Sequence, residues 1–336
     1  MTGYRGLVPL TVLTGFLGSG KTSLLNRWLR DPRLAGCAVL VNEFGEIGLD
    51  HALVEAVDGS PVLLANGCVC CAIRDDLKEA LLRLDERRRR GEIPPYTRLV
   101  IETTGVADPA PILATLLNDP ELRHHYRLGA VIATVDAVHG AGDLARREEA
   151  RKQVACADTV LITKADLTAP AAATEAVRAL NAQARIAMAA VADAGLLARA
   201  DVYAPRVRAA DVRAWLGTDS AHAHGASYAS GHVVVDEALD WTAFGLWLTM
   251  LLHVHGSRIL RVKGLLNVAG SETPVVVNGV QHLVHPPFHL RRWPDEDRRS
   301  RLVFITEGLA PATLGASLAA FNALGARLLP AAGSSS

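Results

Sequence analysis

Residues 15 to 22, GFLGSGKT, match the phosphate-loop pattern G-x-x-x-x-G-K-[ST] at every fixed position. Glycines in such a loop let backbone amides turn inward around phosphate oxygens, and the helix that follows adds partial positive charge. Lys21 would contact the β and γ phosphates of a bound nucleotide, and the Thr22 hydroxyl would coordinate Mg²⁺. The predicted nucleotide-binding residues of this loop are Gly15, Gly18, Ser19, Gly20, Lys21, Thr22 and Ser23. A glycine-rich turn that matches by chance is the alternative.

A carboxylate ends the apolar run Leu99–Glu102, and Thr103, Thr104 and Gly105 follow it. At the carboxyl end of a parallel strand beside the phosphate loop, Glu102 would supply an oxygen to bound Mg²⁺ or to its water shell. Gly105 would bring a backbone N–H to the γ phosphate. We therefore predict Lys21, Thr22 and Glu102 as the catalytic group, against the alternative of an ordinary acid at a strand end.

The tetrapeptide TKAD, residues 163 to 166, ends another apolar run. A carboxylate at Asp166 can accept both the N1–H and the 2-amino group of guanine, a pair of donors that adenine lacks. The stem of Lys164 would pack over the base. The sequence thus predicts a guanine nucleotide, although a surface Lys and Asp after a strand are common.

Cys68, Cys70 and Cys71 form a C-x-C-C cluster after a short apolar run, out of five cysteines in the chain. Three thiolates suit Zn²⁺ or a similar thiophilic ion, and they leave one tetrahedral position open, as a metal carrier needs. A redox pair and buried inert cysteines are the alternatives. Cys37 and Cys156 stand alone in apolar surroundings, where the inert interpretation is favoured.

The segment VNEFGEIGLD carries acids at Glu43, Glu46 and Asp50, in the region where a GTPase would place its first switch. These carboxylates would serve Mg²⁺, the carried metal or water, and a plain solvated loop is the alternative. Twelve histidines include two H-x-H pairs, at 222 and 224 and at 253 and 255. For these, ordinary surface histidines are favoured over a metal reservoir.

The elements that must position these residues alternate between short apolar runs and amphipathic stretches. Strands are predicted at 7–13, 38–41, 98–101, 130–135 and 159–162, with helices such as 75–90 and 143–154 between them. This alternation predicts an α/β domain with a doubly wound, mostly parallel sheet over residues 1–217. A polar linker is expected at 218–231, a smaller α+β domain at 232–330 and a disordered tail at 331–336.

The composition excludes some functions. The 336 residues carry 35 Lys and Arg and 35 Asp and Glu, so no net charge favours nucleic acid or an anionic membrane. No apolar run reaches the roughly 18 residues of a membrane span, and the N-terminal stretch does not read as a signal peptide. We therefore expect a cytoplasmic protein.

Five motifs, GFLGSGKT, NEFGEIGLD, NGCVCC, IETTGVADP and TKAD, together resemble the CobW family of metal-handling GTPases, which is related to UreG and HypB. The segments DWTAFGLWLTMLLHVHG, ILRVKGLLNV and NGVQ resemble the C-terminal domain of that family. The resemblance implies GTP hydrolysis, and binding of Zn²⁺ or Co²⁺ by Cys68, Cys70 and Cys71. Hydrolysis should be slow without a partner, because nothing in the sequence identifies an arginine finger or a catalytic glutamine. The resemblance also implies delivery of the metal to a client metalloprotein under nucleotide control, and homodimers that depend on nucleotide or metal.

Two departures from the family stand out. Val41 takes the place of an acid that many members carry before N-E-F-G, and long histidine runs are missing.

Two other functions would use the same phosphate loop. A small-molecule kinase would need an acceptor and no cysteines, and a nucleotide-gated scaffold would use its cysteines only for packing.

Overall fold

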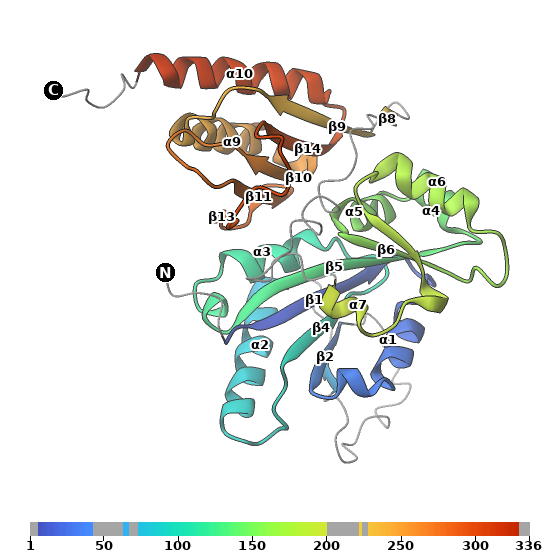
Figure 1. The fold of residues 1–336 in the computed structure, drawn as a ribbon. Coiled ribbons are helices and arrows are strands. Elements are labelled where there is room, and N and C mark those ends of the chain that lie inside the picture. The colour runs from blue at the N-terminus through green and yellow to red at the C-terminus, as the bar shows by residue number, and fades with distance from the viewer. Residues whose placement is uncertain (1–5, 43–62, 67–72, 200–221, 224–227, 329–336) are drawn as a thin grey trace. The chain divides into compact units, whose positions relative to one another are not determined.

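The computed structural model describes residues 6–42, 63–66, 73–199, 222–223 and 228–328 (Figure 1). The chain divides into two compact units. The first comprises Met1–Arg178 and Ala184–Arg206, and the second comprises Ala179–Gln183 and Val207–Ser336. Among the helices of the described ranges, none combines the length and the apolar character that a membrane crossing requires.

The first unit is built on a sheet of seven strands, all parallel. In spatial order they are β3 (Leu63–Asn66), β2 (Cys37–Asn42), β4 (Arg98–Glu102), β1 (Val8–Gly15), β5 (Tyr126–Asp136), β6 (Thr159–Thr163) and β7 (Arg185–Met188). The central strands are buried on both faces, which is why their sequences are continuous apolar runs. The predicted parallel sheet is confirmed.

Helices cover both faces of this sheet, and the strand order explains which helix lies where. The chain moves from β1 to the β3 edge, first through α1 (Lys21–Leu29), and every crossover after β3 runs the other way. Because crossovers between parallel strands are right-handed, α1 lies on one face and the later helices lie on the opposite face. Those helices are α2 (Ile73–Arg89), α3 (Ala110–Asn118), α4 (Gly140–Arg146), α5 (Glu148–Cys156) and α6 (Ala171–Leu180).

After β7 the chain returns across the face that α1 covers. The short 3-10 helix η3 (Ala189–Val191) and α7 (Leu196–Arg199) make this return, and α7 lies beside α1 (Figure 1). Trp28 of α1 and Leu197 of α7 belong to one apolar cluster with Leu13 and Ile132 of the sheet. Two further 3-10 helices, η1 (Pro32–Leu34) and η2 (Leu122–His124), lie in connections.

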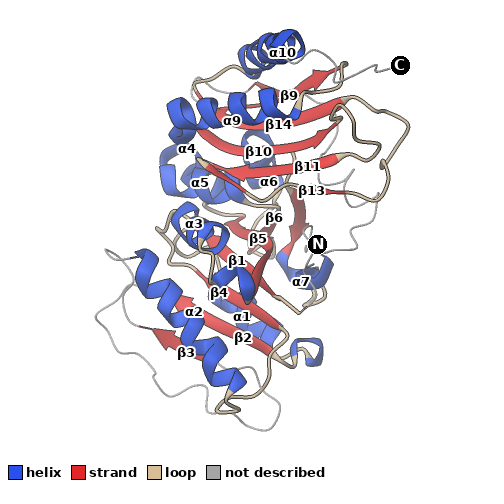
Figure 2. Ribbon diagram, turned by 90° about the vertical axis from the view of Figure 1, so that its left-hand side faces the viewer, coloured by secondary structure: helices blue, strands red, loops and turns tan. Residues whose placement is uncertain are grey.

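The second unit is an antiparallel sheet with two helices on one face (Figure 2). The strands follow the order β12 (Leu283–Val284), β11 (Val275–Val280), β10 (Ile259–Leu266), β14 (Ser300–Glu307), β9 (Tyr228–Val235) and β8 (His222–Ala223), and β13 (Phe288–His289) pairs with β11. The helices α9 (Trp241–His255) and α10 (Pro311–Leu328) bury Trp247 and Leu318 against Phe304 of the sheet, and η4 (Gly256–Arg258) follows α9. The predicted α+β architecture is confirmed.

The sequence predicts the first strand of the second domain at 232–235, but β9 begins four residues earlier, at Tyr228. Residues 228–231 pair with β14, and backbone hydrogen bonds of this kind do not depend on the polar or small side chains of the segment. That part of the linker predicted at 218–231 is therefore strand, and so are residues 222–223. Residues 218–221 and 224–227, and the tail at 331–336, lie outside the described residues.

Candidate nucleotide site

The phosphate loop lies between β1 and α1, at the carboxyl edge of the parallel sheet. Gly18 and Gly20 have φ angles of 69° and 87°, in the left-handed region that favours glycine. Gly20 occupies the N-cap position of α1, so the loop runs directly into the helix N-terminus. The backbone therefore has the form that a phosphate-binding loop requires.

Gly15 shows why one glycine of the pattern tolerates no side chain. Its φ angle is 145°, and a Cβ at this position would lie 2.3 Å from Oγ1 of Thr134 and 2.7 Å from Oγ of Ser19. Those two hydroxyls form a buried hydrogen bond of 2.7 Å. Thr163 at the end of β6 donates to the Ser19 carbonyl at 2.7 Å, so three neighbouring strands hold the loop in place.

Lys21 lies folded over the loop rather than out in solvent. Its side chain is buried, and Nζ donates to the carbonyls of Gly15 at 2.8 Å and Phe16 at 3.3 Å. A cation held on the rim of a loop of inward-turned amides is placed to contact phosphate oxygens. Ser23 follows on the exposed side of α1.

Thr22 and Glu102 meet although 80 residues separate them in the sequence. The Thr22 hydroxyl donates to Oε1 of Glu102 at 2.5 Å. Strands β1 and β4 are neighbours in register, with Leu13 beside Glu102, so the loop after β1 passes over the end of β4. A hydroxyl and a carboxylate are the hard oxygen donors that Mg²⁺ takes beside a nucleotide, so this pair fits the ion.

The loop that follows Glu102 packs against the phosphate loop. A Cβ on Gly105 would lie 2.8 Å from the backbone Cα of Leu17, so only glycine allows this approach. Thr103 ties the start of the same loop to β1, because its amide donates to the Leu13 carbonyl at 2.9 Å and its hydroxyl to Oγ1 of Thr14 at 2.9 Å. Gly105 thus lies beside the phosphate loop, which agrees with the predicted contact of its backbone N–H with the γ phosphate.

Lys164 and Asp166 follow β6 at the same edge of the sheet. Lys164 has a φ angle of 54°, which is uncommon for a residue with a side chain, and its carbonyl accepts from the Leu167 amide at 3.0 Å. This turn leaves the Asp166 side chain exposed. An exposed carboxylate on a tight turn at the strand end is available to the edge of a base.

Asp136 is a site residue that the sequence reasoning missed. It ends β5, is buried, and forms an ion pair with Nζ of Lys164. It also accepts from the amides of Val138 at 2.7 Å and His139 at 3.4 Å. Burial raises the pKa of its carboxyl, but these hydrogen bonds and the Lys164 charge lower it more, so the pKa lies below its ordinary value. In the sequence, the segment VDAVH at residues 135–139 gives only a weak indication of a functional residue, namely an acid at the end of an apolar run.

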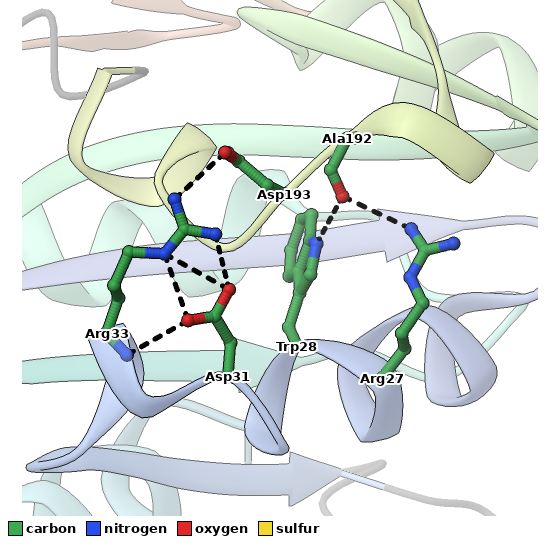
Figure 3. A network of polar contacts seen from close by, with 6 residues as sticks. All are labelled: Arg27, Trp28, Asp31, Arg33, Ala192 and Asp193. Carbon is green, nitrogen blue, oxygen red and sulfur yellow. Dashed lines mark hydrogen bonds and ion pairs between the residues drawn. The ribbon is translucent and has the colours of Figure 1, made fainter.

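Helix α1 also holds the segment after β7 through a network of polar contacts (Figure 3). Trp28 donates from Nε1 to the Ala192 carbonyl at 2.9 Å, and Arg27 binds the carbonyls of Ala189 and Ala192. The Arg33 guanidinium bridges Asp31 at 2.5 Å and Asp193 at 2.9 Å. No sequence motif marks these residues, because their partners at 189–193 lie about 160 positions away.

The expected metal ligands Cys68, Cys70 and Cys71 lie outside the described residues, as do Glu43, Glu46 and Asp50. The cysteines at 37 and 156 are buried thiols, and burial raises the pKa of the Cys37 thiol to about 12. Both are therefore poor thiolate donors. Within the described ranges, no three His, Cys, Asp or Glu side chains gather closely enough to hold a metal ion.

A phosphate loop between a central parallel strand and its helix, with an acid at the end of the neighbouring strand, defines a P-loop nucleotide-binding protein. The model of the CobW/HypB/UreG nucleotide-binding domain matches residues 9–190, and that of the C-terminal domain of the cobalamin synthesis protein CobW matches residues 228–322. The chain belongs to the CobW/HypB/UreG family.

Individual relatives agree with this assignment. The chain is 34% identical over 303 residues to the zinc chaperone YjiA of Escherichia coli strain K12, which covers 89% of this chain and 93% of that protein. It is 30% identical over 355 residues to the zinc chaperone CobW of Pseudomonas aeruginosa PAO1, and this match covers 93% of this chain and 90% of that protein. The crystal structure of Zn(II)-bound YjiA GTPase from E. coli matches with a TM-score of 0.70 at 30% identity, covering 94% of this chain and 99% of that one.

Proposed function

We propose that this protein is a GTPase that carries zinc, and that it delivers the metal to a client metalloprotein under nucleotide control. The observation that carries the nucleotide part is the contact of Thr22 with Glu102 beside Lys21, which supports a site for magnesium and phosphate on a parallel sheet. The zinc part is supported by relatives named zinc chaperones and by a Zn(II)-bound relative that shares the fold.

In this proposal each described residue of the site has one task. The amides of Gly18 to Gly20 and the Lys21 ammonium hold the phosphates, and Asp166 reads the N1–H and 2-amino groups of guanine. Thr22 and Glu102 hold Mg²⁺, which when bound would neutralise charge between the β and γ phosphates. No motif in the sequence identifies an arginine or glutamine that would orient an attacking water, so we expect slow hydrolysis until a partner supplies such a group.

The cargo site is assigned to Cys68, Cys70 and Cys71, with Zn²⁺ as the first candidate and Co²⁺ as the second. Three thiolates leave a coordination position free for a client ligand, so transfer can proceed without first opening a closed site. Glu43, Glu46 and Asp50 are candidates for additional ligands or for coupling to the nucleotide.

The remaining expectations concern surroundings and partners. A thiolate carrier needs a reducing compartment, so we place the protein in the cytoplasm. The balanced charge of 35 basic and 35 acidic residues supports a protein client rather than nucleic acid or a membrane. A homodimer that depends on nucleotide or metal is a further proposal, carried over from the family resemblance.

The deciding experiment is a competition titration of Zn²⁺ against a chelating indicator, with the protein loaded with Mg·GDP or with Mg²⁺ and a non-hydrolysable GTP analogue. We expect a tight site whose affinity differs at least about fivefold between the two nucleotides, the lower end of ordinary coupling. Changing Cys68, Cys70 and Cys71 together to Ser should abolish it.

A matched control changes the two buried cysteines, as Cys37→Ala with Cys156→Ala, and should leave zinc affinity unchanged. Equal zinc affinities in both nucleotide states would exclude nucleotide control. Tight zinc binding that persists in the triple Ser variant would move the cargo site elsewhere.

A further inference from the structure

Gln153 on α5 is a buried polar side chain to which the proposed nucleotide site assigns no task. It is fully buried, at 0% exposure, although it belongs to a residue type that is usually found at the surface. Its Nε2 donates to two backbone carbonyls, those of Gly105 at 3.1 Å and Ala107 at 3.0 Å. Both carbonyls belong to the loop after β4 that packs on the phosphate loop.

These two hydrogen bonds determine the orientation of the amide. Carbonyl oxygens accept and cannot donate, so the NH₂ group of Gln153 must face the loop and Oε1 must face away. No described group donates to Oε1, which is buried. The same side chain lines a small cavity of about 10 Å³ with Phe16 and Ser19 of the phosphate loop, a volume close to the smallest that holds one water molecule. Gln153 therefore lies between the loop after β4 and the phosphate loop.

The loop that Gln153 holds is short and tightly turned. The Ala107 amide donates to the Thr104 carbonyl at 3.2 Å, and Gly105 touches Leu17 so closely that no side chain would fit there. Lys152, the neighbour of Gln153 on α5, adds an ion pair with Asp108 at 3.6 Å. Two consecutive residues of one helix thus bind the loop along its length.

Helix α5 leads from this loop to the other end of the nucleotide site. It ends at Cys156, and Asp158 then pairs with β5, through its amide at 2.8 Å to the Val131 carbonyl and its carboxylate at 3.0 Å to the Val131 amide. Strand β6 and the turn with Lys164 and Asp166 follow at once. One rigid stretch therefore joins the loop next to the γ phosphate with the residues assigned to the base.

We propose that Gln153 is a positioning residue, which holds the loop 103–108 against the phosphate loop and makes α5 respond to the γ phosphate. The inference rests on the proposed GTPase function, because that function places Gly105 next to the γ phosphate. With GTP bound, the loop has a further ligand and the contact with Gln153 helps to keep it in place. With GDP bound, the loop has no such ligand and Gln153 holds it alone.

The proposal predicts an effect that depends on which nucleotide is bound. Gln153→Met keeps the length of the side chain and removes the donor. Without two hydrogen bonds the loop is less well ordered for the γ phosphate, so affinity for a non-hydrolysable GTP analogue should fall about 10-fold. Affinity for GDP, which does not reach the loop, should change less than about 2-fold. Fluorescence titration of the full-length protein with labelled nucleotides measures both constants.

Gln153→Glu adds a readout in pH that a purely structural role would not give. At about pH 8 its carboxylate faces two carbonyls and repels them, whereas a protonated carboxyl donates one hydrogen bond. Burial and the carbonyl dipoles raise the pKa of such a carboxyl, so affinity for the GTP analogue should recover in part by about pH 5.5. Wild type and Gln153→Met should not show this recovery. Glu149→Gln, one turn earlier on the same helix, is the matched control and should behave like wild type at both pH values.

The outcomes separate the two proposals. If wild type binds both nucleotides and Gln153→Met binds both equally well, or weakens both to the same extent, Gln153 is not a positioning residue but the GTPase proposal stands. If wild type binds neither nucleotide, the proposed function fails and this inference with it. Should Gln153→Glu not fold, the comparison of the GTP analogue with GDP in Gln153→Met decides the matter alone.

Discussion

At the scale of single residues, the contact of Thr22 with Glu102 brings together the two oxygen donors of the proposed magnesium site. Glu102 is 3% exposed, and a carboxylate so deeply buried is stable only when its hydrogen bonds and charge are satisfied. The Thr22 hydroxyl supplies one such bond at 2.5 Å. The same oxygens would therefore exchange a hydrogen bond to each other for bonds to Mg²⁺ when the nucleotide binds.

Removing the Thr22 hydroxyl should weaken catalysis without unfolding the protein. Thr22→Ala takes one hydrogen bond from the buried Glu102, so the free energy of unfolding should fall by about 1 kcal/mol. The value of kcat/KM for GTP should fall more, about 10- to 100-fold, because a magnesium-side oxygen is lost. Thr22→Ser keeps the hydroxyl and should stay within about threefold of wild type. Phosphate release at several Mg²⁺ concentrations checks this, and equal activity of the Ala and Ser variants would remove Thr22 from the magnesium site.

His285 in the second unit is a buried histidine whose charge state ties stability to pH. Burial and the nearby Arg261 charge lower the pKa of its imidazole from 6.5 to about 3. In the unfolded chain the same group takes up a proton below about pH 6.5. Between these two values the unfolded state binds more protons, so the free energy of unfolding must fall as pH decreases through this window.

Replacing His285 by a neutral side chain should remove this pH dependence. Between pH 7 and pH 5 the wild-type protein should lose up to about 2 kcal/mol of stability from this residue, and His285→Gln should lose that much less over the same interval. Urea denaturation at the two pH values gives both numbers. The control His253→Gln, at an exposed site on α9, should keep the wild-type dependence of stability on pH. If the free energy of unfolding changed equally with pH in all three proteins, His285 would not be the source of this dependence.

At the scale of elements, α1 does more than present the phosphate loop. Its last turn carries Arg27 and Trp28, which bind carbonyls of the segment 189–192 (Figure 3). That segment follows β7, the parallel neighbour of β6, so it begins at the same edge of the sheet as Lys164 and Asp166. The helix that starts at the phosphates is therefore bonded to a segment beside the residues assigned to the base.

Trp28→Phe tests this bond at small structural cost. The ring stays in the core, but the Ala192 carbonyl loses the indole donor, so the free energy of unfolding should fall by about 1 kcal/mol. The change affects the segment beside the residues assigned to the base and not the residues assigned to the phosphates. We therefore expect KM for GTP to rise by a larger factor than the factor by which kcat falls. Arg30→Ala, at an exposed position one residue after α1, should leave stability within about 0.5 kcal/mol of wild type. A similar loss in both variants would mean that the indole bond contributes nothing of its own.

Much of this architecture could be predicted because its signals are local. The phosphate loop, the strand ending at Glu102 and the TKAD turn each stand within a few residues, and alternating apolar runs and helices predict the parallel sheet. The missed residues have another character. Asp136 and Gln153 act through Lys164 and Gly105, which lie 28 and 48 positions away, so only the folded sheet brings them together. Strand β9 was predicted too short, since its first residues owe their place to backbone pairing.

At the scale of the whole molecule, the described residues connect every part of the nucleotide site through one sheet edge. Lys21, Glu102, Gly105 and Asp166 follow three strands, and α1 and α5 tie the intervening loops together. Cys68, Cys70 and Cys71 come directly after β3, which pairs in parallel with β2 in this sheet. A change at the phosphate loop after β1 can therefore reach β3 through the hydrogen-bonded strands β4 and β2.

Coupling between nucleotide and zinc has to be mutual. If the GTP-bound form holds Zn²⁺ more tightly by some factor, then Zn²⁺ must raise the affinity for GTP over GDP by the same factor, because both routes around the cycle end in the same state. We therefore expect saturating Zn²⁺ to change the ratio of the Kd values for a GTP analogue and GDP by at least about fivefold, a coupling free energy of about 1 kcal/mol. Nucleotide titrations with zinc buffered high or removed by a chelator measure this ratio, and the triple Ser variant of the cysteine cluster should show none of the change. A zinc effect on nucleotide affinity that differs from the nucleotide effect on zinc affinity would show that zinc acts at a second site, since a single coupled pair of sites obliges the two factors to be equal.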